Sequence, residues 1–338
     1  MVNITLGIMI PPWAKAAHHR QDMWLSRFKD VDVNVRFVVG AGGGPPRFAD
    51  ARVTHVWGRE RLPHVGKVTE KSATWWMSPG DEDWRCKSDD DTLVHLKRLH
   101  AYLKGLDPDI ASVSGYMKWR GWQVRELRAC GGVWGNAGHV NALFDAGACP
   151  NASGPFPYMS GAFYCMSRAA RTMLSNDKEF NSFVGDASRR NLITPKCSSA
   201  SKCASVTFER RAWHHEDAGI AFNLFRAAAR SQTKLRVVRV PGHYNDPFSI
   251  ETDESMQSVR WSSNAVFVHG IKSRKLYNKA VERWKISRPS RLGSFECLCP
   301  DEFRYNWTTA RLPCSEHDSS LCRFDPRNLF DFCGWEWV

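Results

Sequence analysis

The chain has 338 residues, of which 43% are apolar and 24% are charged. This is ordinary globular composition with ample material for a core, and the length fits a single large α/β unit carrying an appendage. The formal net charge of +12 favours polyanionic partners, but the basic residues form only short, dispersed runs without zinc-finger spacing or an RNA-binding signature, so nucleic acid is not the expected partner.

Strand-like and helix-like segments alternate through the first hundred residues. Continuous apolar runs predict strands buried on both faces, whereas apolar residues at helical spacing predict the helices between them. We expect strands at 4–10, 33–40 and 83–91, and helices at 16–28, 68–77 and 92–106, the last capped by Thr92. The alternation predicts a doubly wound, mostly parallel central sheet flanked by helices.

A glycine-rich segment, "AGGGPP" at 41–46, follows the second expected strand. It lacks both the Gly-Lys-Ser/Thr ending of a phosphate-binding loop and the Gly-x-Gly-x-x-Gly spacing of a dinucleotide-binding turn. We therefore expect a flexible connection at this point of the chain.

Five of the eleven cysteines, Cys297, Cys299, Cys314, Cys322 and Cys333, lie in the last 42 residues and predict a disulfide-stapled appendage over 286–338. A zinc site is the alternative, but "CLC" has one intervening residue where a zinc knuckle normally has two or more. A further disulfide between Cys197 and Cys203 would close the loop between them.

The sequence leaves the compartment open. N-glycosylation sequons at Asn3, Asn151 and Asn306 fit a secretory route. The opening segment is too short for a signal peptide or a membrane anchor, and no other segment approaches a membrane span. The expected location is the Golgi or secretory lumen if an upstream anchor is missing from this chain, and the cytoplasm otherwise.

Three consecutive aspartates, Asp89, Asp90 and Asp91, end the third expected strand. Ligands of open α/β sheets bind beyond the carboxyl ends of the strands, and hard divalent cations prefer carboxylate oxygens together with substrate phosphates. A metal site for a diphosphate is one interpretation of the triplet. A solvated acidic turn is the other.

Further segments decide between these interpretations. In chain order they are "HHRQDMW" with Arg20 and Trp24, "FVVG" (37–40), "VTEKS" (68–72, with Lys71), "KSDDDTLV" (87–94), "FPYMSGAFYCMS" (156–167), "HEDAGIAF" (215–222) and "AVFVHGIKS" (265–273). This series resembles the motifs of the β-1,3-glycosyltransferase group, which includes galactosyltransferases, N-acetylglucosaminyltransferases and the Fringe proteins. The resemblance covers about 1–285 and implies a catalytic domain with the glycosyltransferase A-type fold over that range.

The resemblance implies a metal site and a nucleotide site. Asp91 would bind Mn²⁺ or Mg²⁺, with His269 as the second protein ligand, and Asp89 and Asp90 would contact the metal, the ribose or a nearby lysine. A hydrogen-bonded histidine at a strand end is the alternative for His269. Three basic residues, Arg20, Lys71 and Lys87, would meet the nucleotide of a UDP-sugar or balance the acidic cluster.

The resemblance also implies the catalytic residues. Asp217 would be the general base that deprotonates the acceptor hydroxyl, and Glu216 would bind acceptor hydroxyls or orient the loop. Alternatively, both are acids in the first turn of a helix. Tyr158, Ser160 and Gly161 would floor the donor-sugar or acceptor pocket, with core packing as the alternative for Tyr158. A single displacement at the anomeric carbon would give a β-linkage from an α-linked donor.

The expected activity is therefore an inverting, metal-dependent hexosyltransferase. It would move a hexose or N-acetylhexosamine from a UDP-sugar to a hydroxyl of a glycan or glycoprotein, forming a β-1,3 linkage. Phe163 and Ala218 depart from the group's motifs, and both lie on the expected acceptor side. A divalent-metal phosphotransferase or nuclease, and a non-catalytic glycan- or nucleic-acid-binding protein, are the alternatives.

Overall fold

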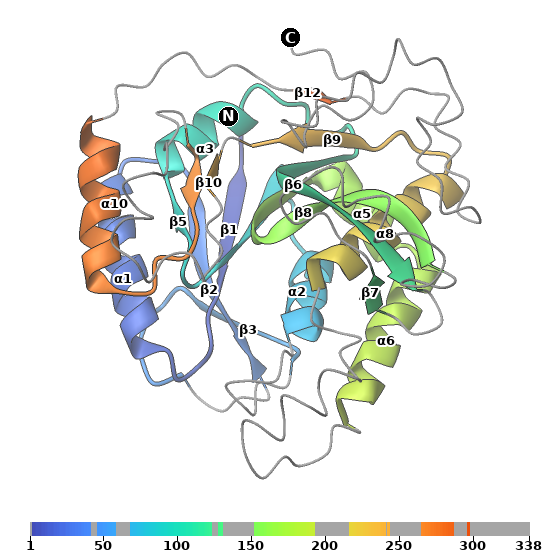
Figure 1. Ribbon diagram of the computed structural model, residues 1–338, viewed down its shortest axis with the longest axis horizontal. Helices are drawn as coiled ribbons and strands as arrows, with labels where there is room; N and C mark the ends of the chain where they lie inside the picture. Colours follow the sequence, from blue (N-terminus) through green and yellow to red (C-terminus); the bar gives the residue numbers. More distant parts are fainter. Residues whose placement is uncertain are drawn as a thin grey trace.

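The computed structural model describes residues 2–41, 46–58, 68–123, 128–130, 152–192, 216–240, 242–243, 265–286 and 296–297. Within these residues a nine-stranded sheet has the order β12-β9-β6-β8-β4-β1-β2-β3, with β7 paired to β6 beside this path (Figure 1). Its strands are β1 (Ile4–Met9), β2 (Asn34–Gly40), β3 (Val53–Val56), β4 (Trp84–Asp89), β6 (Ser112–Gln123), β7 (Arg128–Cys130), β8 (Ala152–Ser167), β9 (Arg236–Arg239) and β12 (Glu296–Cys297).

Most strands of this sheet run in one direction. The strands β3, β2, β1 and β4 form parallel ladders with one another. Strand β8 is antiparallel to both β4 and β6, so β6 and its parallel neighbour β9 share the direction of the first four. The expected mostly parallel α/β architecture is confirmed.

Helices cover both faces of the sheet (Figure 1). Side chains alternate along each strand, so successive residues of β2 belong to different cores: Phe37 and Val39 to one, Val38 to the other. The first core contains residues of α1 (Lys15–Leu25), α3 (Leu96–Leu103) and α10 (Arg274–Ile286), and the second contains residues of α2 (Val68–Met77), α5 (Arg168–Ser175), α6 (Lys178–Leu192) and α8 (Glu216–Arg230). This two-sided cover explains why β1 and the buried end of β2 are predominantly apolar.

A small second sheet, in the order β10-β11-β5, positions the metal-binding candidates. It contains β5 (Leu93–Val94), β10 (Gly242–His243) and β11 (Phe267–Val268). In the antiparallel β5–β11 ladder, Phe267 lies opposite Val94 and Val268 lies opposite Leu93. This register brings the residue after β11 close to the turn before β5.

The helix expected at 92–106 begins later than predicted. Residues 93–94 form β5, the helix begins at Leu96 with His95 at its N-cap, and Thr92 is not a cap. Thr92 is instead buried, and its backbone N–H donates to the Asp89 carbonyl at 3.1 Å. Pairing with β11 extends this segment, and such a distant partner is invisible in the local sequence.

Several predicted features lie outside the described residues. They are most of the glycine-rich segment, Cys197 and Cys203, Asn151 and Asn306, and nearly all of the expected appendage. The exception in the appendage is β12, which pairs antiparallel with β9 and so adds a strand to the main sheet. Among the helices that the structure describes, none is both long and apolar enough to cross a membrane.

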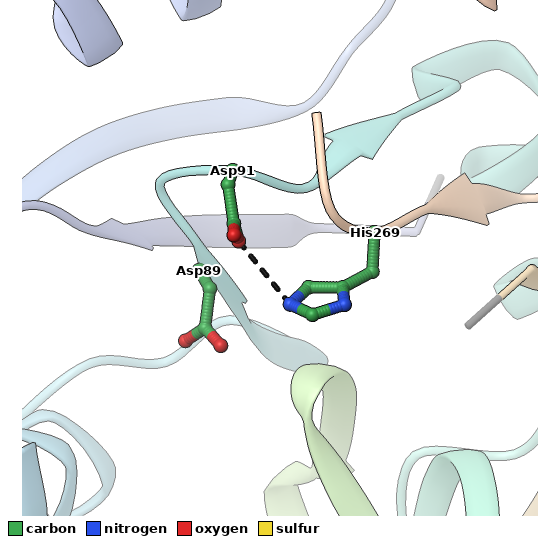
Figure 2. A group of neighbouring side chains, drawn as sticks. All are labelled: Asp89, Asp91 and His269. Atoms are coloured by element: carbon green, nitrogen blue, oxygen red, sulfur yellow. Dashed lines mark ion pairs between the residues drawn. The ribbon is translucent and has the colours of Figure 1, made fainter. Parts of the chain in front are cut away.

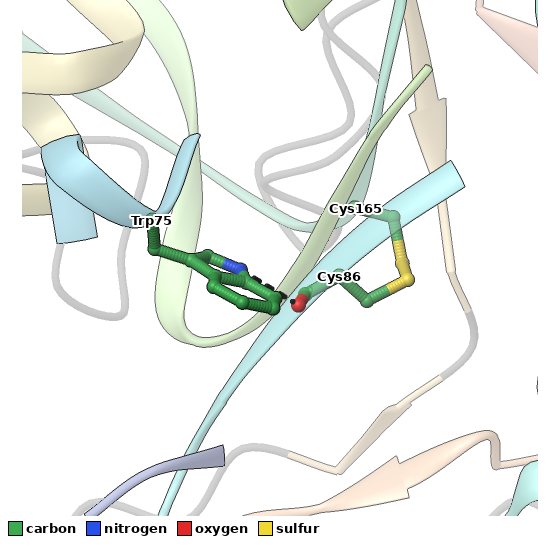
Figure 3. The surroundings of a disulfide bond; sticks show 3 residues. All are labelled: Trp75, Cys86 and Cys165. Atoms are coloured by element: carbon green, nitrogen blue, oxygen red, sulfur yellow. Dashed lines mark hydrogen bonds between the residues drawn. A yellow bond between two sulfur atoms is a disulfide. The ribbon is translucent and has the colours of Figure 1, made fainter. Parts of the chain in front are cut away.

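A disulfide joins Cys86 of β4 to Cys165 of β8 (Figure 3). The two residues are direct partners in the antiparallel ladder, and both are fully buried. The Trp75 indole N–H donates to the Cys86 carbonyl at 3.2 Å. The bridge therefore lies in the sheet between the strand that carries the acidic turn and the strand that carries Gly161.

Replacing both cysteines by alanine should lower the free energy of unfolding by about 2–4 kcal/mol, because the bridge closes a long loop in the unfolded chain. The cysteines are 79 positions apart. Chemical denaturation of the native protein, with and without reductant, and of the C86A/C165A variant measures this. Reductant should destabilise the native protein by more than it destabilises the variant, because only the native protein has the Cys86–Cys165 bridge to lose; an equal response of both proteins would contradict the bridge.

Candidate active site

The acidic turn is held in place by the first helix. Asp89 is the last residue of β4, and the turn leads directly into β5. The buried Gln21 side chain of α1 donates to the carbonyls of Asp90 at 3.0 Å and Thr92 at 2.8 Å. These bonds satisfy buried backbone acceptors and leave the aspartate side chains to other partners.

Asp89, Asp91 and His269 form a cluster whose ligand atoms all lie within 4.8 Å of one another (Figure 2). Asp91 Oδ1 is 3.2 Å from His269 Nε2. The Ile271 backbone N–H donates to the Asp91 carbonyl at 2.8 Å, which joins the chain after β11 to the turn. Two carboxylates and one imidazole are a donor set that suits Mn²⁺, so the residues present fit the expected ion.

Asp90 and Asp91 have pKa values that are shifted in opposite directions by their surroundings. Burial raises the pKa of Asp91, but the hydrogen bond and charge of His269, together with the charge of Lys272 and a backbone hydrogen bond, outweigh burial and hold that pKa below its ordinary value. Burial and the neighbouring charges of Asp91 and Asp89 raise the pKa of Asp90 to about 7, against the opposing effect of Lys71 and Arg20. The carboxylates repel one another, so a bound divalent cation would stabilise the turn.

Arg20 and Lys71 are the cations that act on Asp90. Lys71, on α2, is 2% exposed, and Arg20, on α1, is partly buried. Arg20 Nε is buried and has no hydrogen-bond partner among the described residues. A buried guanidinium donor beside an acidic turn is suited to a phosphate oxygen.

Lys87 lies on the same strand as Asp89 but points into the protein. Its ammonium donates to the Gly161 carbonyl at 2.7 Å, to Asp89 Oδ1 at 3.2 Å and to Glu216 Oε1. Burial lowers the pKa of Lys87, but the charges of Asp89 and Glu216 outweigh burial and raise it. Of the two roles expected for Lys87, these contacts favour charge balance.

Glu216 and Asp217 begin helix α8, where acids are stabilised by the positive end of the helix dipole. Burial raises the pKa of Glu216 to about 7, although Lys87 opposes the shift. Its second oxygen, Oε2, is buried and accepts no hydrogen bond from the described part of the chain. Asp217 is partly buried and accepts backbone N–H groups from Gly161 and Ala218, each at 2.8 Å.

Gly161 of β8 lies next to Glu216 and Asp217. A Cβ atom on Gly161 would lie 3.1 Å from Glu216 Oε1 and 3.4 Å from both Asp217 Oδ2 and Lys87 Nζ, so a larger residue would displace charged groups. Ser160 is buried, and Tyr158 belongs to a core cluster at 4% exposure, which favours the packing alternative for that ring.

The structure thus brings the predicted residues together in two groups. The metal candidates form the first group, and Lys87, Gly161, Glu216 and Asp217 form the second. The Lys87–Asp89 contact joins them. Sequence reasoning missed Gln21, although its position within the "HHRQDMW" segment, beside Arg20, was a signal that it faces the acidic turn.

No protein-family model matches the chain, and no curated protein sequence is similar to it. Among solved structures, the chain is similar to the galactosyltransferase LgtC in complex with donor and acceptor sugar analogs, at 11% identity and a TM-score of 0.40, covering 83% of this chain and 93% of that one. It is also similar to the apo glycosyltransferase GlyE of Streptococcus pneumoniae (10% identity, TM-score 0.34, 87% and 67% covered).

A further solved structure, apo WbbM, a bifunctional glycosyltransferase, is 12% identical, with a TM-score of 0.37 and coverage of 85% of this chain and 50% of that one. All three likenesses are too distant to transfer an activity.

Proposed function

We propose that this chain is an inverting, metal-dependent glycosyltransferase with the A-type fold. It transfers a hexose or N-acetylhexosamine from a UDP-sugar to a hydroxyl of a glycan or glycoprotein, forming a β-1,3 linkage. The observation that carries the proposal is the meeting of Asp89, Asp91 and His269 beside Glu216 and Asp217. These residues come from distant segments that resemble one family's motifs in order.

The donor half of the proposed mechanism lies at the end of β4. Asp89, Asp91 and His269 would hold Mn²⁺ or Mg²⁺, which when bound supplies Lewis-acid stabilisation of the leaving diphosphate. Arg20 and Lys71 would bind the nucleotide end of the donor. The unpartnered Arg20 Nε is the local support for a phosphate contact.

The acceptor half lies at the start of α8. Asp217 would take the proton of the attacking hydroxyl, and Glu216 Oε2 would accept a hydrogen bond from a second acceptor hydroxyl, since it has none from the described residues. Ser160 and Gly161 would form the adjoining wall. The buried disulfide supports a secretory compartment, where such bonds persist.

The test is a donor panel of UDP-galactose, UDP-glucose and the two UDP-N-acetylhexosamines with Mn²⁺, Mg²⁺ or a chelator. We expect transfer or slow hydrolysis of at least one donor with metal, and loss of turnover with the chelator. Nuclear magnetic resonance of the product gives the anomeric configuration and the linkage. Failure of every UDP-sugar to bind in the presence of metal would overturn the proposal, and an α-linked product would overturn its inverting mechanism.

A further inference from the structure

The ammonium of Lys87 is fully committed inside the protein. A lysine ammonium has three N–H donors, and three acceptors surround this one: the Gly161 carbonyl, Asp89 Oδ1 and Glu216 Oε1. The side chain is 1% exposed. No donor remains for a phosphate oxygen of a nucleotide.

The three acceptors belong to different parts of the site. Asp89 is a metal candidate, Gly161 lies on β8, and Glu216 begins α8. Gly161 in turn donates its N–H to Asp217 at 2.8 Å. A continuous series of contacts therefore runs from the metal cluster through Lys87 to the candidate base.

The charges in this series are interdependent. Lys87 lies between two carboxylates in a buried setting, where removing one partner of an ion pair leaves an uncompensated charge. Without the Glu216 charge, the full positive charge of Lys87 would act on Asp89, at 3.2 Å, and would oppose a cation bound there. The absence of a side chain at Gly161 allows the groups to approach this closely.

We propose that the Lys87–Glu216 ion pair positions the metal-binding turn relative to Asp217 and sets the affinity of that turn for its cation. Lys87 is thus a positioning residue and does not contact the donor nucleotide. The inference rests on the proposed function for its catalytic part. Its metal part can be measured without turnover.

In the first experiment Mn²⁺ is titrated into nucleotide-free protein at pH 8, and electron paramagnetic resonance measures the free Mn²⁺ at each step. It compares the native chain with Lys87→Met, Glu216→Gln and the double variant. Although Glu216 is not a ligand, Glu216→Gln should weaken Mn²⁺ binding ~10-fold through the uncompensated lysine. The double variant, which lacks both charges, should bind Mn²⁺ within ~3-fold of the native protein.

The matched control is Lys97→Met, which removes the lysine of an exposed ion pair with Asp30 and should leave Mn²⁺ binding unchanged. Unchanged binding in Glu216→Gln, or weakening in the double variant as large as in the single one, would overturn the proposal. Should Lys87→Met fail to fold, Glu216→Gln and the double variant still decide the outcome.

The second experiment measures steady-state kinetics of the same proteins. Each single variant should lower kcat ~30-fold with the donor KM within ~3-fold, and the double variant should lose no more than the worse single variant, because the two residues act as one unit. A raised donor KM with unchanged kcat in Lys87→Met would identify a nucleotide contact and overturn the positioning role. If the native chain turns over no UDP-sugar, the proposed function fails, whereas the Mn²⁺ titration still tests the ion pair.

Discussion

Replacing Asp91 by asparagine should weaken Mn²⁺ binding by at least ~100-fold and lower transfer by a similar factor or more, because one of the three proposed protein ligands loses its charge. Asp91 Oδ1 is also the partner of His269 Nε2 at 3.2 Å, so the substitution removes the anion that orients the imidazole. Asparagine keeps the shape of the side chain, and the fold should survive. The measurements are Mn²⁺ titration, UDP-sugar turnover and thermal unfolding.

Asp90→Asn is the matched control for the metal measurement. Asp90 is the adjacent carboxylate, but it lies outside the cluster formed by Asp89, Asp91 and His269. Its substitution should change Mn²⁺ affinity in nucleotide-free protein by less than ~5-fold, because it removes a neighbouring charge and no ligand. Equal effects of the two substitutions would mean that the triplet acts as a diffuse acidic patch, and a metal affinity unaffected by Asp91→Asn would refute the site.

The strands that carry the site could be predicted because their signals are local. The buried runs within β1 and β2, at 4–9 and 37–40, are predominantly apolar, as expected for strands covered on both faces. The acidic triplet could likewise be placed at a strand end from its own neighbours. The fold class followed from the alternation of these local patterns.

The rest could not be predicted because it depends on distant pairing. The two-residue strand β5 exists only because β11 pairs with it, so Thr92 looked like a helix cap. Cys86 and Cys165 meet because β8 runs antiparallel beside β4. Nothing in the local sequence marks these two among the eleven cysteines of the chain.

In the candidate site too, some residues could be predicted from the sequence and others could not. Similarity to family motifs identified Asp91, His269 and Asp217 as candidates, but it left Lys87 between nucleotide binding and charge balance. Its contact with Glu216 spans 129 positions in the chain and depends on the fold bringing the start of α8 to the Lys87 side chain. Because the Lys87 side chain is only 1% exposed, its ammonium is suited to charge balance and not to nucleotide binding.

Asp217→Asn should lower kcat by ~10²–10⁴-fold while leaving Mn²⁺ affinity and donor KM within ~3-fold, because it removes the proposed general base and no member of the Asp89, Asp91 and His269 cluster. The asparagine oxygen can accept the Gly161 N–H that Asp217 Oδ2 accepts at 2.8 Å, but the amide nitrogen cannot accept the Ala218 N–H that Oδ1 accepts at 2.8 Å. The contact with Gly161 should therefore persist at the cost of one local hydrogen bond. A loss of rate with intact donor binding is the signature of an interaction made in the transition state.

The alternative role of Asp217, a first-turn acid that stabilises its helix, predicts a different outcome. Glu179 holds the equivalent place in α6, is 49% exposed and pairs with Arg226 and Arg230, so Glu179→Gln is a control that removes a first-turn acid together with its exposed ion pairs. A helix-dipole role alone would make both substitutions lower the unfolding temperature slightly and leave kcat intact. If Asp217 is a general base, kcat should fall in Asp217→Asn and stay unchanged in Glu179→Gln. Of the two carboxylates, only Asp217 lies beside the Lys87–Glu216 pair and the metal candidates.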